Sequence, residues 1–311
     1  LELNFDKRTR GFISIAAPPF TIINNAEKIQ LEINETAHFA PIISASLNFE
    51  VIISLVSLAK TMDRWKNRVA VVTGASAGIG WAIAQALLNS GMIVVGLARR
   101  VEKIEQQKAT LAANLASRLH AYKCDVNDER DIVAAFKWID SELKGADVLV
   151  NNAGVLKDTL LTAPGNTDKI KDVINTNITG LILCAREAYQ SMKRRQVDGH
   201  IVNMNSVVGH SVPIGVDTLS TYNVYPATKY AVTAITETLR IELLNDNSKV
   251  KVTSISPGAV RTEIFNDPDL IASNIPFLVA EDIANSVVHV ISTPKHVEIK
   301  ELTIKPLGER F

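Results

Sequence analysis

The stretch Val69-Ala-Val-Val-Thr-Gly-Ala-Ser-Ala-Gly-Ile-Gly80 decides the fold of this chain. Its first four residues form a short apolar run, which is typical of a buried strand. Gly74, Gly78 and Gly80 follow, and apolar residues then recur at helical spacing over 79–90. Glycine lets the backbone approach an anion closely, and the first N–H groups of a helix point toward that anion. A glycine-rich turn alone is a weak signal, but its place between a strand and a helix favours a dinucleotide site over an ordinary turn.

Strands and helices alternate along residues 62–311. The expected strands span 69–74, 92–98, 120–124, 148–151, 200–205, 249–256 and 299–304. The expected helices span 79–90, 101–119, 129–143, 168–195, 222–245 and 281–291. Apolar strands that are each followed by a helix indicate a parallel sheet covered on both faces. Right-handed crossovers then predict an α/β fold with a doubly wound, mainly parallel sheet of the Rossmann type, in a single domain over 62–311.

The composition narrows the classes of partner. Lys plus Arg and Asp plus Glu number 33 each among the 311 residues, so the formal net charge is zero. This balance argues against a nucleic-acid or anionic-membrane partner held by bulk electrostatics. Cys124 and Cys184 are too few for a disulfide framework and lie in apolar surroundings, which predicts reduced thiols in a cytoplasmic protein. The six histidines are scattered, and no metal site is predicted.

Residues 1–61 differ in character from the rest of the chain. The sequence begins with Leu1 and is polar without a sustained period over 23–36. We expect this segment to lie outside the fold, to be poorly ordered and to precede a native start at Met62. Its most apolar run, 51–59, has nine residues and is well short of the ~20 that span a bilayer. No integral membrane span is therefore predicted, and a membrane-associating leader through 51–59 is the alternative.

The residues that follow the strands lie on the ligand side of such a sheet. The strand 92–98 ends in Ala98, near the place where an NAD-specific protein usually carries a carboxylate for the ribose 2′-hydroxyl. Arg99 and Arg100 follow instead, and guanidinium groups pair well with a 2′-phosphate. This arrangement favours NADP over NAD. The alternative is a solvated arginine pair at a helix start, where positive charge opposes the helix dipole.

Two further strand ends carry polar side chains. Asp125 and Val126 follow the third strand, where the carboxylate can meet an adenine edge or simply cap a helix, and the sequence leaves both roles open. The fourth strand ends in Asn151-Asn152-Ala153-Gly154, whose amides can tie neighbouring loops together beside a cofactor. Taken alone, that run would be interpreted as a turn.

Tyr225-Pro-Ala-Thr-Lys229 places a phenol and an ammonium four residues apart, on one face of a helix. A free tyrosine has a pKa of ~10, and a nearby ammonium lowers that pKa, which gives an acid/base matched to an alcohol or a ketone. Tyr189-Gln-Ser-Met-Lys193 has the same spacing, but it lies late in its helix, far from the ligand side of the sheet. We therefore predict Tyr225 as the acid/base.

Hydrogen-bond donors follow the fifth strand. Ser206 comes directly after this strand and can donate to a substrate oxygen, although it can also simply cap the next loop. Asn205 and Ser211 are rival donors, but Asn205 should face away from Ser206. Asn177 lies in a run of two Asn and two Thr, which are poor helix formers; the run indicates a local break that holds a water, or else a tolerated surface face.

The sixth strand also ends in a turn. Pro257 and Gly258 turn the chain there, and Thr262 can reach a cofactor from the far side. The segment 263–276 is rich in Asn, Asp and Pro, and we predict it to be a substrate lid.

Together these motifs resemble the short-chain dehydrogenase/reductase family in order and spacing. The matching residues are Thr73-Gly-x-x-x-Gly-Ile-Gly80, Asp125, Asn151-Asn-Ala-Gly154, Asn177, Ser206, Tyr225-x-x-x-Lys229 and Pro257-Gly258. The opening Met62-Asp-Arg-Trp and the run 96–104 are similar, more narrowly, to the insect farnesol dehydrogenases and to a vertebrate group acting on steroids and carbonyls. Ser206 and Tyr225 lie 19 residues apart, which is longer than is common in the family, and residues 1–61 have no counterpart in it.

The resemblance implies a role for each site residue. Tyr225 is implied as the acid/base and Lys229 as the group that lowers its pKa and binds the nicotinamide ribose. Ser206 is implied to orient the substrate oxygen, and Asn177 to hold the water of a proton relay. The residues implied to bind NADP are Gly74, Ser76, Gly78, Ile79, Gly80, Arg99, Arg100, Asp125, Val126, Asn152, Ala153, Gly154, Tyr225, Lys229, Pro257, Gly258, Val260 and Thr262.

The expected activity is NADP-dependent hydride transfer between nicotinamide and an alcohol or carbonyl carbon. Apolar residues near Ser206 indicate a lipophilic allylic or secondary alcohol such as farnesol; they are Val207, Val208, Val212, Pro213 and Ile214. The alternatives are a broad-range carbonyl or hydroxysteroid reductase and, disfavoured by the complete set of reactive residues, a nucleotide sensor. The resemblance also implies a homodimer or homotetramer.

Overall fold

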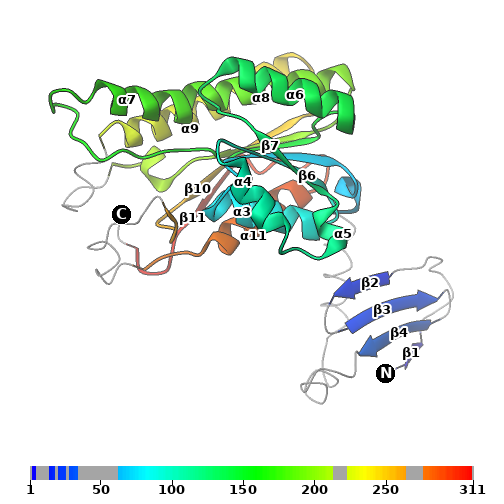
Figure 1. Cartoon of the computed structure of the whole chain (residues 1–311). Coiled ribbons are helices and arrows are strands. Elements are labelled where there is room, and N and C mark those ends of the chain that lie inside the picture. Colours follow the sequence, from blue (N-terminus) through cyan, green and yellow to red (C-terminus); the bar gives the residue numbers. More distant parts are fainter. Residues whose placement is uncertain are drawn as a thin grey trace. The chain divides into compact units, whose positions relative to one another are not determined.

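The structure, a computed structural model, describes residues 62–212, 223–263 and 276–309, together with four strands within residues 2–33. The chain divides into two compact units, Leu1–Lys60 and Thr61–Phe311. In the first unit, an antiparallel sheet has the order β1-β4-β3-β2; its strands are β1 (Glu2–Asn4), β2 (Ser14–Ala17), β3 (Phe20–Asn25) and β4 (Lys28–Ile33) (Figure 1). The polar and apolar residues of β4 alternate, which is the period of a strand and a signal missed in the sequence. A native start at Met62 stays a prediction.

The second unit is built on a parallel sheet in the order β11-β10-β9-β8-β5-β6-β7. Its strands are β5 (Val69–Thr73), β6 (Ile93–Ala98), β7 (Leu119–Lys123), β8 (Val148–Asn151), β9 (His200–Met204), β10 (Lys251–Pro257) and β11 (Glu301–Ile304). The strand order reverses between β5 and β8, which is the place where doubly wound sheets bind their ligands. The predicted doubly wound fold is confirmed.

Helices cover both faces of this sheet (Figure 1). One face carries α3 (Gly78–Asn89), α4 (Val101–Lys108), α5 (Ala113–Ala116) and α11 (Ala280–Ser292). The other carries α6 (Glu129–Leu143), α7 (Thr167–Ile174), α8 (Leu181–Arg194) and α9 (Tyr225–Asn245). Successive residues of β5 belong to the two cores in turn, because Ala70 and Val72 pack with α3 and α11 whereas Val69 and Val71 pack with α6 and α8. Because both faces of the strand are covered by helices, its first four residues are all apolar and do not alternate with polar ones.

Two predicted helices differ in extent from the observed ones. The predicted helix 101–119 is wrong as one element, because Thr110 donates its hydroxyl to the Gln107 carbonyl at 2.7 Å and Ala112 adopts an extended ψ of 145°. Helix α9 begins at Tyr225, because Asn223 has a φ of 41° and cannot lie within a right-handed helix. Residues 213–222, and the predicted lid apart from its two end residues, lie outside the described residues.

The predicted long helix 168–195 contains a π-helical turn, η2 (Asn175–Gly180), between α7 and α8. This turn includes the Asn and Thr cluster for which the sequence indicated a local break. A π-turn widens the helix by one residue per turn, and such turns occur frequently at functional sites. Thr176 and Asn177 are buried there whereas Asn175 and Thr179 are exposed, so Asn177 itself does not belong to a surface face.

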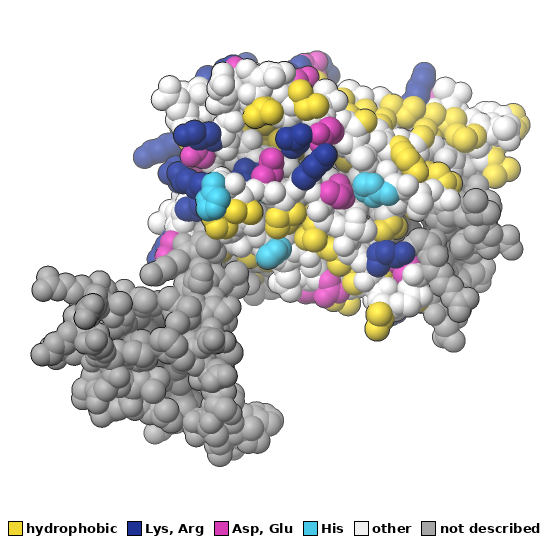
Figure 2. Space-filling model, turned by 180° about the vertical axis from the view of Figure 1, so that it is seen from behind, with side chains coloured by type: hydrophobic (Ala, Val, Ile, Leu, Met, Phe, Trp, Pro, Cys, Tyr) yellow, Lys and Arg dark blue, Asp and Glu magenta, His cyan; other side chains and the backbone are white. Residues whose placement is uncertain are grey.

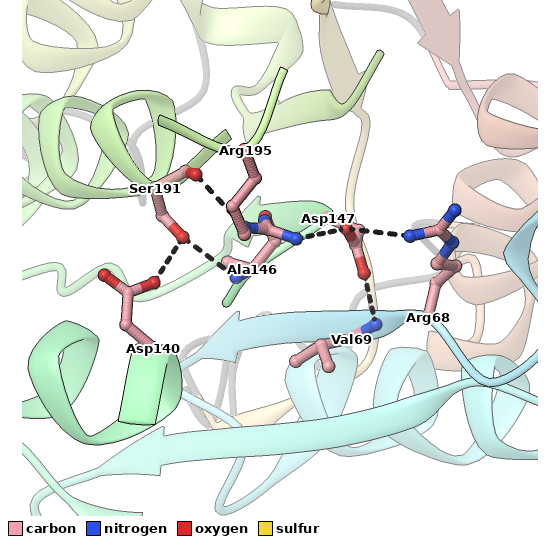
Figure 3. A network of polar contacts seen from close by, with 7 residues as sticks. All are labelled: Arg68, Val69, Asp140, Ala146, Asp147, Ser191 and Arg195. Carbon is pink, nitrogen blue, oxygen red and sulfur yellow. Dashed lines mark hydrogen bonds and ion pairs between the residues drawn. The ribbon is translucent and has the colours of Figure 1, made fainter. Parts of the chain in front are cut away.

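A buried carboxylate joins the amino ends of two central strands, opposite the ligand side (Figure 3). Asp147 precedes β8 and accepts hydrogen bonds from the Val69 backbone N–H and from Arg195 Nη1, both at 2.9 Å. Arg68 Nη1 lies 3.8 Å from the same carboxylate. Arg195 also donates to the Ala146 carbonyl. This network fixes the end of α8 against β5 and β8.

We expect Asp147→Ala to lower the free energy of unfolding by about 2–4 kcal/mol, because it leaves a buried backbone N–H and a guanidinium without their shared acceptor. Urea unfolding of the full chain measures this loss. Asp198→Ala is the matched control, since the ion pair of Asp198 with Lys295 at 3.2 Å is exposed and its loss should cost less than about 1 kcal/mol. Equal losses in the two variants would contradict the role given to Asp147.

The surface combines charged and apolar side chains. On the face drawn in Figure 2, basic and acidic side chains are interspersed, and apolar side chains form patches between them. Several large apolar side chains on the two long helices are exposed, namely Ile182 on α8 and Tyr230, Ile241 and Leu244 on α9. Within the described part of the chain, no helix combines the length and the apolar character needed to cross a bilayer.

Candidate active site

A cleft opens at the carboxyl ends of the central strands and encloses about 1280 Å³, counted out to its mouth. Every residue predicted to contact the cofactor lines the cleft, from Gly74 after β5 to Thr262 after β10. Ser206 also lines it, whereas Asn177 does not but is hydrogen-bonded to Val155, which does. The strand-end residues therefore converge as the sequence predicts.

The glycine-rich turn fits the phosphates of a dinucleotide. Gly74 has a φ of 68°, and a Cβ atom on Gly80 would lie only 2.3 Å from the Gly74 carbonyl oxygen. The backbone is therefore packed too closely for any side chain at Gly80. Ala77, at the N-cap of α3, offers no side-chain hydrogen bond to the first turn. The first N–H groups of α3 thus remain available for an anion in the cleft.

The amides after β8 hold the floor of the cleft together. Thr73 Oγ1 accepts hydrogen bonds from the backbone N–H groups of Asn152 at 3.0 Å and Ala153 at 2.9 Å. The side chain of Asn152 returns a bond to the Thr73 carbonyl at 3.0 Å. Asn151 donates to Asn203 Oδ1 at 3.0 Å, which joins β8 to β9. The run predicted to tie neighbouring loops does so through these contacts.

The adenosine end of the cleft carries positive charge. Ala98 is buried at the end of β6, and the exposed Arg99 and Arg100 follow it along the cleft. A carboxylate missed in the sequence also reaches this end, because Glu263 lines the cleft and lies 3.2 Å from Arg100 Nη2. Its place depends on chain packing after β10, so no local signal in the sequence indicated it.

Asp125 and Cys124 line the same end of the cleft. Asp125 Oδ1 accepts from the Asn127 backbone N–H at 3.0 Å and so closes a local turn, whereas the residue that caps α6 is Asp128. Burial, together with nearby carboxylates, raises the pKa of the Cys124 thiol to about 12. The thiol stays protonated at neutral pH and is no nucleophile.

Tyr225 and Lys229 meet at the opposite end of the cleft. Tyr225 is the first residue of α9 and is buried, and the Nζ of Lys229 lies 5.5 Å from the centre of its ring. Lys229 Nζ donates to the Met204 carbonyl at 2.9 Å, and burial lowers the pKa of Lys229 to about 8. An ammonium this close to a phenol favours its phenolate form. The pair therefore has the geometry of an acid/base.

Ser206 lies at the same end of the cleft. Its Oγ accepts from the Val208 backbone N–H at 3.3 Å, so the capping role is present beside its place in the cleft. Asn205 also lines the cleft, but its amide donates to Thr233 Oγ1 at 2.9 Å. Ser211 is not among the lining residues. Ser206 is thus better placed than its two rivals.

The second Tyr-x-x-x-Lys pair has a structural role. The Tyr189 hydroxyl donates to Asp246, and Lys193 Nζ contacts the same carboxylate at 2.6 Å. Burial and this acceptor raise the pKa of Tyr189. The pair lies outside the cleft, and its phenolate is disfavoured. The structure therefore supports Tyr225 over Tyr189.

Asn177 holds the start of α9 from the π-turn. Its Oδ1 accepts from the Val155 N–H at 2.8 Å, and its Nδ2 donates to the Val155 carbonyl at 3.0 Å and to Thr228 Oγ1 at 3.1 Å. Thr228 in turn donates its hydroxyl to the Tyr225 carbonyl at 2.7 Å. Both amide hydrogens of Asn177 are used, which leaves one lone pair of Oδ1 for a water. The water role implied by the resemblance stays a prediction.

An apolar wall adjoins Tyr225. Val173, Val207 and Val208 form a buried cluster with the Tyr225 ring, and Val155 is packed against it. Val212 is exposed, and Pro213 and Ile214 lie outside the described residues. Over the described ranges, no three His, Cys, Asp or Glu side chains gather where they can hold a metal ion.

The fold and cleft agree with a known class of protein. The model of the short chain dehydrogenase family matches residues 68–269. The chain therefore belongs to the short-chain dehydrogenase/reductase family, as its motifs predict. It is 55% identical over 250 residues to the farnesol dehydrogenase of Aedes aegypti, covering 80% of this chain and 100% of that protein. It is 45% identical over 256 residues to dehydrogenase/reductase SDR family member 11 of Mus musculus, covering 79% of this chain and 96% of that protein.

Solved structures show the same likeness. The closed form of a serine dehydrogenase complexed with NADP+ has a TM-score of 0.69 at 30% identity, covering 78% of this chain and 96% of that one. An alcohol dehydrogenase from Thermococcus sibiricus, complexed with 5-hydroxy-NADP, has a TM-score of 0.68 at 26% identity and covers 78% and 98%. This chain is thus a dehydrogenase whose fold binds a nicotinamide cofactor.

Proposed function

We propose that the protein is an NADP(H)-dependent oxidoreductase that interconverts a lipophilic allylic or secondary alcohol, farnesol or a similar compound, with its carbonyl form. The observation that carries this proposal is the convergence of Tyr225, Lys229 and Ser206 with the glycine cradle and two arginines in the lining of one cleft. The 55% identity to a farnesol dehydrogenase supports the substrate class. Val155, which lines the cleft and packs against the buried valine cluster beside Tyr225, supports a lipophilic substrate.

Each site residue has its own role in the proposed reaction. The nicotinamide, when bound, exchanges hydride with the carbinol carbon. Tyr225 exchanges a proton with the substrate oxygen, and Ser206 donates a hydrogen bond to the same oxygen. The Lys229 ammonium favours the Tyr225 phenolate, so the phenol can act near neutral pH. Asn177 and Thr228 hold the Tyr225 backbone in position through two hydrogen bonds.

A substrate panel tests the proposed activity. Farnesol, other allylic and secondary alcohols, steroids and simple carbonyl compounds are assayed in both directions by NADPH absorbance. The highest kcat/KM is expected for a lipophilic alcohol such as farnesol. Higher values across small or steroidal carbonyl compounds would favour a broad-range reductase, and no turnover of any compound would leave only the nucleotide-sensor alternative.

We propose NADP rather than NAD because Ala98 and the two arginines offer positive charge where an NAD-binding protein carries a carboxylate. Arg99→Ala should reduce the preference for NADPH over NADH by about tenfold, since one guanidinium–phosphate contact is worth roughly 1.5 kcal/mol. The ratio of the two kcat/KM values measures this preference. An unchanged ratio would show that Arg99 does not select the cofactor.

We also propose a homodimer or homotetramer in the cytoplasm. The exposed apolar side chains Ile182 on α8 and Tyr230, Ile241 and Leu244 on α9 support self-association, because burying them in an interface is favourable. The two free, buried cysteines support a reducing compartment. Sedimentation of the purified chain, and the location of a tagged copy in cells, test these two statements.

A further inference from the structure

A carboxylate already engages the cations at the adenosine end of the cleft. Glu263 Oε2 lies 3.2 Å from Arg100 Nη2, and Glu263 Oε1 lies 3.5 Å from Lys103 Nζ. The three side chains are between 40% and 55% exposed, so none of them is closed off from a ligand. Glu263 and Arg100 both line the cleft. The carboxylate thus contacts Arg100, one of the two arginines to which the proposed function assigns the 2′-phosphate.

The backbone carries Glu263 to this place. The residues after β10 form a short parallel bridge, in which Arg261 donates its N–H to the Leu278 carbonyl at 3.0 Å and Leu278 donates to the Ala259 carbonyl at 2.9 Å. Thr262 then packs over Gly78, where an added Cβ would lie 3.3 Å from Thr262 Cγ2. Glu263 follows directly and meets the first turn of α4. Its position is therefore set by the cleft wall itself.

We propose that Glu263 is a specificity-determining residue that competes with the 2′-phosphate of the cofactor for Arg100 and Lys103, and so limits the preference of the site for NADP(H) over NAD(H). The inference rests on the proposed function, because it concerns a nucleotide bound with its ribose near these cations. A nucleotide with a free 2′-hydroxyl leaves the ion pairs of Glu263 intact. A 2′-phosphate must displace the carboxylate or lie beside it, and either outcome weakens binding.

The charges of the neighbouring groups support this competition. Arg100 and Lys103 approach Glu263 from α4, and both lower its pKa, so the carboxylate stays ionised at neutral pH. Arg99 forms none of the described ion pairs with Glu263, and it lines the cleft. A dianionic phosphate attracts the two cations more strongly than a single carboxylate does, so the phosphate still binds. Glu263 reduces the gain in affinity without abolishing it.

Calorimetry with two small probes isolates this effect. Adenosine 2′,5′-bisphosphate carries the 2′-phosphate, adenosine 5′-monophosphate lacks it, and neither depends on hydride chemistry. In Glu263→Gln, the Kd of the bisphosphate should fall roughly threefold to tenfold, since two exposed ion pairs no longer compete, while the Kd of the monophosphate changes less than twofold. Glu142→Gln, which makes the same charge change on α6 across the sheet, should alter neither Kd. In an Arg100→Ala background, the gain from Glu263→Gln should shrink.

The outcomes separate this inference from the proposed cofactor. If the unmodified chain prefers the bisphosphate and Glu263→Gln leaves both Kd values unchanged, the role of Glu263 is wrong and the NADP proposal stands. If the unmodified chain shows no preference and Glu263→Gln creates one, Glu263 acts as proposed and the NADP proposal is wrong. If neither chain distinguishes the probes, both statements are wrong. An equal gain in Glu142→Gln would also overturn the inference, because net charge alone would explain it.

Discussion

Tyr225→Phe should lower kcat by roughly 10³-fold, because the variant keeps the ring but loses the hydroxyl that exchanges a proton with the substrate oxygen. The ring packs with Val173, Val207 and Val208, and phenylalanine preserves those contacts. The glycine cradle and the arginines belong to other segments of the cleft lining and are unchanged in this variant, so the Kd of the cofactor should stay within about twofold of its original value. Steady-state kinetics and calorimetric titration measure the two quantities on the same preparation.

The chain itself provides the matched control for this prediction. Tyr189→Phe removes a hydroxyl from a second Tyr-x-x-x-Lys pair, outside the cleft, where Asp246 accepts its hydrogen bond. This variant should retain kcat within about twofold, with a stability loss of about 1 kcal/mol or less for a partly exposed hydrogen bond. Comparable kcat losses in the two variants, or an active Tyr225→Phe, would refute the assignment of Tyr225 as the acid/base.

The sequence predicts the site well where a residue directly follows a strand. Parallel strands place their carboxyl ends at one edge of the sheet, so the position after each strand is enough to bring distant residues together. Gly74, Asn152, Ser206 and Pro257 come from four different strand ends, and all line one cleft. The same rule excluded Tyr189 as the acid/base, whereas the Tyr-x-x-x-Lys spacing alone did not distinguish it from Tyr225. Local pattern and topology together were therefore sufficient for this part of the site.

The sequence predicts the site poorly where side-chain packing decides which residues reach the cleft. The composition of 175–179 indicated a break, but whether Asn177 lines the cleft depends on the contacts of its amide with Val155 and Thr228. Glu263 reaches Arg100 only because the chain after β10 is held by a bridge to Leu278. Contacts between residues so far apart leave no periodic or local signal.

Lys229→Met should remove most of the activity and yet stabilise the fold at neutral pH. Burial lowers the pKa of Lys229 to about 8 from an ordinary value of 10.5, which corresponds to ~3 kcal/mol spent in keeping the buried ammonium charged. Methionine has a similar length and no charge, but it leaves the Met204 carbonyl without its donor, which costs ~1 kcal/mol. The free energy of unfolding at pH 7 should therefore rise by about 1–3 kcal/mol. Urea unfolding measures this rise.

The pH dependence of the unmodified chain follows from the same pKa. Between pH 8 and 10.5, the unfolded chain keeps the Lys229 side chain protonated while the folded chain releases the proton. The unfolded state then binds more protons, so the contribution of Lys229 makes the free energy of unfolding increase with pH across this window. Below pH 8 both states are charged, and the full cost of the buried ammonium is present. Lys229→Met should therefore lose this slope and show its largest stability gain below pH 8.

A second buried lysine distinguishes a catalytic ammonium from a structural one. Burial also lowers the pKa of Lys251 to about 8, but its Nζ donates to the Pro294 carbonyl at 2.6 Å and to Thr293 Oγ1 at 3.1 Å. Lys251→Met leaves several oxygens without a donor, so it should destabilise the chain and leave kcat unchanged. In Lys229→Met, kcat should fall about 10²-fold, and the apparent pKa of the remaining activity should rise toward that of a free phenol. An unshifted pH profile in Lys229→Met would show that Lys229 does not tune Tyr225.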